Sequence, residues 1–348
     1  MLTRREFSRY FLAGSTALLG SRKLWSAGTP PVSSAPLKLV ERYEFPPEVK
    51  GHLDHLIVDL QGHRLFTTAE DHKSVEVFDL QTGKLIHAIG GIERPHSILY
   101  RQDLDRFYVT DGFGGKLKIF DGRTYELIKD VKLLVDADST AYDPATKYLY
   151  VVNGGGDAKM TYTTISIIDT TTGEKVGDMK VVGDTLGCMV LETSSPNMYV
   201  NNRAKSQVDV VDRNARRVLA SWPVTLGKEN DPIALDEANH RLFVACRSGQ
   251  IVVFDTNTGK ELQALPIGKG VDDLVFDPTS KRLYAPCGGA GTVDVYEQTS
   301  PDHYKSIGKV VSGTLGKTGL LVPELKRYFV AVPQQGNKNA EILVYKVE

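Results

Sequence analysis

The sequence predicts an all-β fold, a seven-bladed β-propeller whose ring is closed by an N-terminal strand. Three observations predict it: a four-strand unit, its repetition at a regular period, and an additional strand before the first copy. The clearest unit runs from Asp231 to Leu265, where four short apolar or alternating runs are separated by turns rich in Gly, Asn, Asp and Ser. One such meander cannot cover both of its faces, so neighbouring copies are required.

Seven copies of this unit follow one another along the chain. The third strand of each copy ends in a recurring dipeptide: Phe78-Asp79, Phe120-Asp121, Ile168-Asp169, Val211-Asp212, Phe254-Asp255, Val295-Tyr296 and Val344-Tyr345. The second strands align as well, beginning at Arg64, Arg106, Tyr148, Met198, Arg241, Arg282 and Arg327. The spacing of about 43 residues matches the four-strand blade of a propeller.

The two ends of the array predict how the ring closes. The last copy ends at Val347 and has no room for a fourth strand, whereas Leu37 to Phe45 forms a strand that belongs to no blade. We expect this segment to complete the seventh blade, which removes the exposed sheet edges of an open array. The predicted domains are therefore an export signal with a flexible spacer over residues 1–36 and a single propeller over residues 37–348.

Composition excludes several classes of protein. The 348 residues carry 42 basic and 43 acidic side chains, which argues against a nucleic-acid footprint spread over the whole surface. Three cysteines without a CxxC or zinc-finger spacing do not form a disulfide scaffold. No apolar run approaches 18 residues, so we predict no membrane span in the mature protein.

The N-terminal segment predicts export. Thr3-Arg4-Arg5-Glu6-Phe7 precedes a short, mildly apolar run, which is the pattern of a twin-arginine signal, and a small-residue cleavage site lies near Ser26-Ala27-Gly28. The alternative is an amphipathic helix that stays with the protein. We expect a periplasmic or otherwise exported protein that is a monomer.

The blade alignment gathers chemically capable residues at one mouth of the central channel. The inner strands are aligned at Asp54, Pro95, Asp138, Gly187, Asp231, Asp272 and Gly319, and the following residues are His55, His96, Ser139, Cys188, Pro232, Asp273 and Leu320. Because inner strands line the channel, their first residues form a ring around its mouth. The predicted ligand-binding residues are Asp54, His55, His96, Asp138, Asp231, Asp272 and Asp273.

Two interpretations of this ring remain open. His55 and His96 with nearby carboxylates suit a divalent metal, because neutral imidazole binds zinc, copper, nickel or iron and carboxylate oxygens suit calcium. The metal, if there is one, is the only cofactor that the sequence indicates. Alternatively, the aspartates and histidines cap the strand starts by accepting backbone amides, and aspartate in four of seven blades favours this structural interpretation.

Other features add little. Cys246 and Cys287 occupy the same position in neighbouring blades and are predicted to be buried free thiols. The segment from Gly154 to Thr164 is an insertion in blade 3, predicted to be a turn over the mouth and either a lid or a tolerated surface loop. No GxSxG elbow accompanies a histidine and an aspartate, so nucleophilic catalysis is not indicated.

The repeats resemble a known family. RFYVTDG, YLYVVNGGG and RLFVACRSG, each followed by a strand ending in Asp and a Thr-Gly turn, resemble the YVTN-repeat, YncE-like propellers found as exported bacterial proteins. The resemblance covers Leu37 to Glu348. It implies the fold and says little about activity, because the repeated residues are those that build blades. Relatives in the family include DNA-binding periplasmic proteins.

We therefore predict an exported propeller that binds a small molecule or a protein at its channel mouth without catalysing a reaction. The first alternative is a metal-dependent hydrolase or lactonase at the same mouth, in which the metal activates water. The second is single-stranded nucleic-acid binding, which predicts an affinity that falls steeply with salt.

Overall fold

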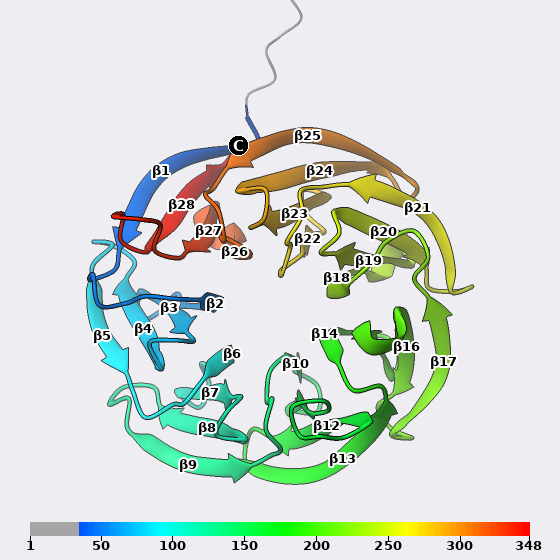
Figure 1. The fold of residues 1–348 in the computed structure, drawn as a ribbon, viewed down its shortest axis with the longest axis horizontal. Coiled ribbons are helices and arrows are strands. Elements are labelled where there is room, and N and C mark those ends of the chain that lie inside the picture. The colour runs from blue at the N-terminus through cyan, green and yellow to red at the C-terminus, as the bar shows by residue number, and fades with distance from the viewer. Residues whose placement is uncertain (1–34) are drawn as a thin grey trace, which may run out of the picture. The chain divides into compact units, whose positions relative to one another are not determined.

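Residues 35–348 are described by the computed structural model, and they form seven four-stranded antiparallel sheets arranged in a ring (Figure 1). The prediction of a seven-bladed propeller is confirmed. The predicted export signal and all but the last two residues of its spacer lie outside the described residues. Within residues 35–348, no helix is long and apolar enough to cross a membrane.

Each blade runs from an inner strand at the channel to an outer strand at the rim. Blade 1 consists of β2 (Leu53–Asp59), β3 (Arg64–Ala69), β4 (Ser74–Asp79) and β5 (Leu85–Ile89). Blade 2 consists of β6 (Pro95–Arg101), β7 (Arg106–Asp111), β8 (Lys116–Asp121) and β9 (Leu127–Lys132). Blade 3 consists of β10 (Thr140–Asp143), β11 (Tyr148–Gly154), β12 (Tyr162–Asp169) and β13 (Glu174–Val182). Blades 4 and 5 consist of β14 (Leu186–Leu191), β15 (Asn197–Asn202), β16 (Gln207–Asp212) and β17 (Arg217–Pro223); β18 (Asn230–Asp236), β19 (Arg241–Cys246), β20 (Gln250–Asp255) and β21 (Lys260–Pro266). Blades 6 and 7 consist of β22 (Val275–Asp277), β23 (Arg282–Cys287), β24 (Thr292–Ser300) and β25 (His303–Val311); β26 (Thr318–Val322), β27 (Arg327–Val332), β28 (Glu341–Val347) and β1 (Leu37–Glu44). Three short 3-10 helices, η1 (Arg203–Lys205), η2 (Glu237–Asn239) and η3 (Pro323–Leu325), each lie directly before or after a strand.

The repeated aspartate at the end of the third strand makes the turn to the outer strand. In blade 1 the Oδ1 atom of Asp79 accepts hydrogen bonds from the backbone amides of Gln81 and Thr82, at 3.1 and 2.8 Å. Gly83 then adopts a φ of +66°, which disfavours residues with a Cβ. Asp121, Asp169, Asp212 and Asp255 accept equivalent amides. The repeat is therefore built from turn chemistry.

The hydrophobic core lies between blades. Second and third strands are buried along their length, and seven apolar clusters each join two neighbouring blades. The outer strand β17 is by contrast mostly exposed. Because each blade covers the face of the next, no blade has a core of its own, and the ring is stable only when it is complete.

Strand β1 closes the ring, as the sequence predicted. It pairs antiparallel with β28, from Leu37 opposite Val347 to Glu44 opposite Glu341. Tyr43 is buried in the cluster between blades 7 and 1. Arg42 forms an ion pair with Glu341 at 2.7 Å.

The turn formed by the insertion in blade 3 is shorter than the predicted turn from Gly154 to Thr164. Gly154 ends β11 and Tyr162 begins β12, so the turn covers only residues 155–161. The other inserted residues extend the pairing between β12 and β13, up to Tyr162 opposite Val182. No residue of this turn is among those that line the cavity at the channel mouth.

Candidate functional site

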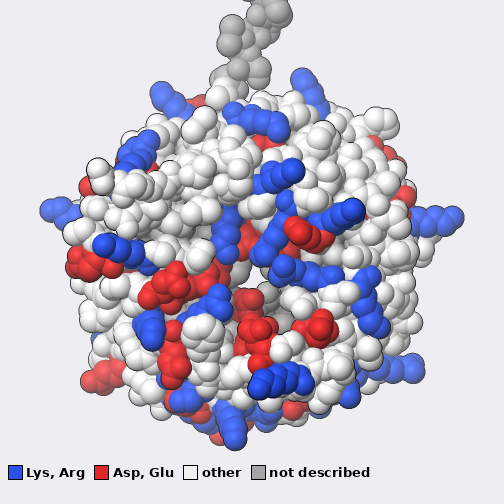
Figure 2. Space-filling view, in the orientation of Figure 1, with Lys and Arg blue, Asp and Glu red and all other residues white. Residues whose placement is uncertain are grey.

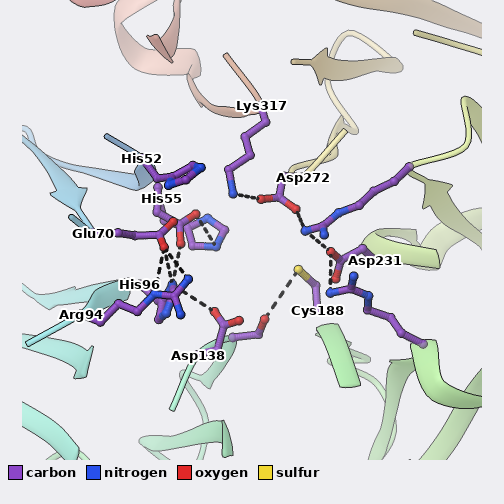
Figure 3. A pocket seen from close by; sticks show the side chains of 14 residues that line it. His52, His55, Glu70, Arg94, His96, Asp138, Cys188, Asp231, Asp272 and Lys317 are labelled. Atoms are coloured by element: carbon purple, nitrogen blue, oxygen red, sulfur yellow. Dashed lines mark hydrogen bonds and ion pairs between the residues drawn. The ribbon is translucent and has the colours of Figure 1, made fainter. Parts of the chain in front are cut away.

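The mouth of the channel contains a polar cavity of about 230 Å³ (Figure 3). Its lining includes residues from blades 1 to 7, and most of them are ionisable. The lining residues are His52, Asp54, His55, Glu70, Arg94, His96, Asp138, Ser139, Cys188, Arg203, Asp231, Arg247, Asp272 and Lys317. Six of the seven residues predicted as ligand-binding line it, and the seventh, Asp273, contacts His55 beside it.

Bulges at the starts of inner strands place two successive side chains at the mouth. In blade 1, Leu53 pairs with Ala69 and Leu56 with Thr67, so Asp54 and His55 lie in an irregular step of the ladder. Blades 2, 4 and 5 have the same register shift. A bulge re-aims the side chains beside it, and here it turns consecutive polar residues toward the cavity.

The alignment of inner strands from the sequence was wrong in two blades. The inner strands of blades 1 and 2 end at Asp59 and Arg101, which pair with the first residues of β3 and β7. Counting back from these equivalent ends places His96, and not Pro95, at the position of Asp54. In blade 7 the same count leads to Lys317 instead of Gly319. Pro95 therefore lies one residue before the ring position, and Gly319 lies two residues after it. The ring is Asp54, His96, Asp138, Gly187, Asp231, Asp272 and Lys317.

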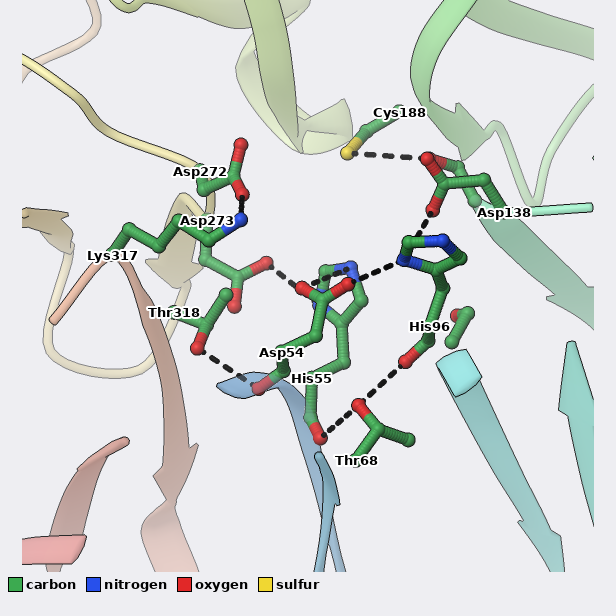
Figure 4. Close-up of polar contacts among 12 residues, drawn as sticks. Asp54, His55, Thr68, His96, Asp138, Cys188, Asp272, Asp273, Lys317 and Thr318 are labelled. Carbon is green, nitrogen blue, oxygen red and sulfur yellow. Dashed lines mark hydrogen bonds and ion pairs between the residues drawn. The ribbon is translucent and has the colours of Figure 1, made fainter. Parts of the chain in front are cut away.

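His96 lies among three carboxylates on one side of the cavity (Figures 3 and 4). Its Nδ1 atom is 2.9 Å from Oδ2 of Asp54 and 3.9 Å from both Glu70 and Asp138. Burial disfavours the protonated ring, but the hydrogen bond to Asp54 and the charges of Asp138, Asp54 and Glu70 outweigh it and raise the pKa of His96 to about 9. The imidazole is therefore protonated at neutral pH. Gly112 leaves room for it, because a Cβ there would lie 2.9 Å from Nε2 of His96.

His55 lies on the other side of Asp54. Its Nε2 atom is 3.7 Å from Oδ1 of Asp54, and its Nδ1 atom is 3.3 Å from Oδ1 of Asp273. Despite burial, these two carboxylates raise the pKa of His55 well above its usual value. Thr318 donates to the carbonyl of Asp54 at 2.9 Å, which joins blades 7 and 1 beneath the pair (Figure 4).

An alternating chain of charges forms the opposite side of the cavity. Arg247 contacts Asp231 at 2.5 Å and also pairs with Asp272. Lys317 contacts the other oxygen of Asp272 at 2.5 Å, and Arg203 lies 3.4 Å from Asp231. The two aspartates are 5% and 9% exposed as residues, whereas the three basic side chains retain 27% to 32%. The basic groups thus form the surface that a ligand meets.

Burial acts to raise the pKa of both aspartates in this series of charges. It raises the pKa of Asp231 to about 7, with Arg247 and Arg203 acting in the opposite direction. For Asp272 burial also acts upward, but Lys317 and Arg247 outweigh it and lower the pKa. Gly187, the one ring residue without a side chain, is required here because a Cβ would lie 2.3 Å from Oδ1 of Asp231.

The ring aspartates are not strand caps. Among the described residues, no backbone amide donates to the side chain of Asp54, Asp138, Asp231 or Asp272, and their partners are basic side chains. Only Asp273 accepts a backbone amide, from Gly319 at 3.0 Å. The structural interpretation of the repeated aspartate is therefore wrong for the ring.

Six lining residues were missed in the sequence, and the signal for three of them was present. Glu70, Arg203 and Arg247 each follow directly after the second strand of their blade, one residue beyond the position that had been aligned. Lys317 was missed through the misaligned blade 7. His52 and Arg94 precede their inner strands by one residue. Arg94 contacts Glu70 through Nε and Nη2, both at 3.1 Å.

The cysteines differ in exposure. Cys246 and Cys287 are fully buried free thiols, as predicted, and each donates to the carbonyl two residues earlier. Cys188 is partly exposed and lines the cavity, 3.9 Å from the hydroxyl of Ser139. Burial and nearby carboxylates, Asp231 first among them, raise the pKa of its thiol well above the usual range. The thiol is therefore a poor nucleophile at neutral pH.

One group within residues 35–348 has the geometry to hold a metal ion. Ligand atoms of Asp54, Glu70 and His96 all lie within 4.8 Å of one another, and all three residues are buried. His55, the other histidine predicted as a ligand, is not in this group and pairs with Asp54 and Asp273 instead.

Comparison with known sequences finds similarity to the predicted family. No family model matches the chain. Two proteins named YncE and described as uncharacterized are similar to it: that of Salmonella typhi, 27% identical over 121 residues, and that of Salmonella typhimurium strain LT2, 26% identical over 121 residues. The match covers 34% of this chain and 34% of each relative. The predicted resemblance to YncE is confirmed.

Comparison with solved structures shows the fold alone. A chain of the hydrazine synthase of Kuenenia stuttgartiensis superposes with a TM-score of 0.72 at 16% identity, over 88% of this chain and 98% of that one. A chain of a mitotic checkpoint complex superposes with a TM-score of 0.73 at 12% identity, over 95% and 99% of the two chains. Proteins with such different names share this architecture, so function has to be argued from the site.

Proposed function

We propose that this protein is an exported propeller that binds a small charged molecule in its mouth cavity and does not transform it. The observation that carries the proposal is the cavity itself, where polar and ionisable groups from the blades converge on about 230 Å³. Pockets for drug-sized ligands measure roughly 300 to 1,000 Å³, so the ligand is smaller.

The charges at the mouth support binding. Building the ring requires neither Asp231 paired with two arginines nor His96 surrounded by carboxylates, because the blades are held together by apolar clusters elsewhere. Burying charged groups costs free energy even when they are paired. A set of ionic groups that the fold does not need is typical of a recognition site.

Export rests on the N-terminal residues. The paired Arg4 and Arg5 followed by Phe7 and a weakly apolar run support delivery to the periplasm by the twin-arginine route. A ligand would then reach the cavity directly from the surrounding medium.

A thermal-shift screen of small charged molecules tests the binding function. We expect at least one molecule to raise the melting temperature of the wild type and to raise that of Ser139→Trp less, since Ser139 lines the cavity. A molecule that stabilises both proteins equally binds elsewhere. If none of the molecules stabilises the protein, the proposed function fails.

The second candidate is a metal-dependent hydrolase or lactonase, favoured by the proximity of Asp54, Glu70 and His96. Two carboxylates and one imidazole hold divalent transition metals with open positions for water, which the metal activates. A metal needs neutral imidazole, whereas the carboxylates around His96 raise its pKa to about 9. A metal ion would have to displace this proton from His96, which favours the binding function over the hydrolase.

Metal analysis after dialysis against zinc, manganese and calcium separates the two candidates. The hydrolase requires one ion per chain that is retained by the wild type and lost from Glu70→Gln. The exposed residue Glu93 supplies the matched control, because Glu93→Gln leaves the three ligands in place. A wild type that retains no ion removes the hydrolase and leaves the binding function intact.

A further inference from the structure

The two sides of the mouth cavity carry different charges. We define the basic wall as Arg203, Arg247 and Lys317 with the two aspartates they contact, and the acidic wall as Asp54, Glu70 and Asp138 around His96. On the basic wall three cations face two carboxylates. Figure 3 shows Asp231 and Asp272 across the cavity from Glu70 and His96, and Figure 2 shows basic and acidic side chains gathered around the central opening.

The basic wall keeps unused hydrogen-bond donors. Arg247 makes both of its ion pairs through Nη2, which leaves Nε and Nη1 without an acceptor among the described residues. Arg203 makes a single ion pair at 3.4 Å and donates no side-chain hydrogen bond within the described part of the chain. A guanidinium presents its donors in a planar fork that matches the two oxygens of a carboxylate or the oxygens of a phosphate. This wall is therefore suited to an oxyanion.

The acidic wall keeps an unused acceptor. Asp54 and Glu70 are occupied by His96 and Arg94, but the side chain of Asp138 is 40% exposed and its nearest cation, Nδ1 of His96, is 3.9 Å away. Asp138 and Asp157 lie near Asp136. Burial and the charges of these two neighbours raise the pKa of Asp136 to about 6 and outweigh the opposing effect of His96 and Arg94, so negative charge predominates here. This corner is suited to an ammonium group.

The two walls exclude ligands that carry one kind of charge. A dicarboxylate on the arginines would place its second charge toward Asp138, and a diamine on Asp138 would place its second charge toward the arginines. Only a molecule with opposite charges at its two ends gains from both walls. The cavity of about 230 Å³ limits it to a small molecule.

We propose that the mouth cavity binds a small zwitterion, with its oxyanion on Arg203 and Arg247 and its ammonium group on Asp138. This is the chemistry of a free amino acid. The inference rests on the proposed binding function, because it names the class of ligand for the same cavity.

Calorimetric titration with a graded series of probes tests the inference. The zwitterions are glycine, β-alanine, 4-aminobutanoate and 6-aminohexanoate. The single-charge analogues, which carry charge of one sign only, are butanoate, butylammonium and inorganic phosphate. We expect the zwitterion whose length matches the cavity to bind at least about tenfold more tightly than any single-charge analogue. The walls act on its two ends independently. Arg203→Gln therefore reduces its affinity at least about tenfold while Arg247 still binds the oxyanion, and Asp138→Asn reduces it to that of butanoate.

Controls separate loss of binding from loss of fold. Arg203 and Asp138 are used because each makes one long ion pair, so their replacement leaves few groups unpaired. Arg217→Gln on the exposed strand β17 is the matched control and retains full affinity. Melting temperatures of all variants verify that the ring is intact.

Three results overturn the inference and leave the proposed binding function open. If butanoate or phosphate binds as tightly as every zwitterion, the cavity is an anion site. If butylammonium binds as tightly as every zwitterion, the cavity is a cation site. If no probe binds, the zwitterion class is wrong, and the thermal-shift screen decides separately whether the cavity binds any small molecule.

Discussion

A chain that begins at Phe45 is expected to lose the cooperative unfolding transition of the propeller or to melt at a temperature lower by about 10 °C or more. Removing β1 exposes the edge of β28 and removes the buried side chains of Leu37 and Tyr43. Each large apolar side chain contributes roughly 1.5–3 kcal/mol when buried. The open edge also pairs with other chains, so we expect aggregation as well.

The control for this deletion is a chain that begins at Ala35 and retains β1. A synthetic peptide of residues 35–45 added to the shorter chain is expected to restore part of the lost melting temperature by adding the missing strand in trans. Equal melting temperatures for the chains that begin at Ala35 and at Phe45 would show that ring closure by β1 does not contribute to stability.

His96→Gln is expected to remove a pH-dependent contribution to the free energy of unfolding. In the folded protein Asp54, Glu70 and Asp138 face His96 and raise its pKa to about 9, against about 6.5 in the unfolded chain. The folded state therefore holds the His96 proton more tightly than the unfolded chain does. This difference adds on the order of 3 kcal/mol to the free energy of unfolding, a contribution that is complete below pH 6.5 and is lost as the pH rises to 9. Urea denaturation at several pH values measures it.

The wild type and His96→Gln are therefore expected to differ most at pH 6 and to converge toward pH 9. Asp231, whose pKa is raised to about 7 by burial, adds a second gain in the free energy of unfolding as the pH falls below 7, and this gain is the same in the wild type and the variant. His303→Gln on the exposed outer strand β25 is the matched control. A constant difference between wild type and His96→Gln from pH 6 to pH 9 would contradict the assignment of a protonated His96.

Much of the fold follows from local chemistry and was therefore predictable. The aspartate at the third-strand end of blades 1 to 5 accepts turn amides, and the second strands begin with Arg64, Arg106, Arg241, Arg282 or Arg327 in five blades. These residues recur because every blade needs the same turns and the same packing. The missing fourth strand of blade 7 and the unpaired Leu37–Phe45 segment then determined how the ring closes.

The site was predictable only in part, because its residues are the exceptions to the repeat. Asp54, His96 and Lys317 hold one structural position but share no residue type, so no pattern relates them. The sequence count led to Pro95, one residue before His96, and to Gly319, two residues after Lys317, because the start of an inner strand carries no fixed residue type. Arg203 and Arg247 lie just beyond a strand end, where turn residues are expected. Only the register of the strands shows that they face the same cavity.

The pairing of charges at the mouth could not be predicted from the sequence either. A balanced composition of 42 basic and 43 acidic residues is compatible with a uniformly mixed surface. In the structure the charges separate into a basic and an acidic wall. Blades 4, 5 and 7 contribute Arg203, Arg247 and Lys317, whereas blades 1 to 3 contribute most of the carboxylates together with Arg94 and His96. Separation of this kind depends on which blades are neighbours across the ring.

The measurement that tests the central claim most directly is a calorimetric titration of the most stabilising small molecule into the wild type and Ser139→Trp. Ser139 lines the cavity and is 8% exposed, so the indole fills the space that a ligand would occupy. Thr172→Trp, in an exposed turn of blade 3 outside the cavity, is the matched control. We predict one binding site per chain in the wild type and in Thr172→Trp, and none in a folded Ser139→Trp. Unchanged affinity in Ser139→Trp would contradict the claim that the mouth cavity is the functional site.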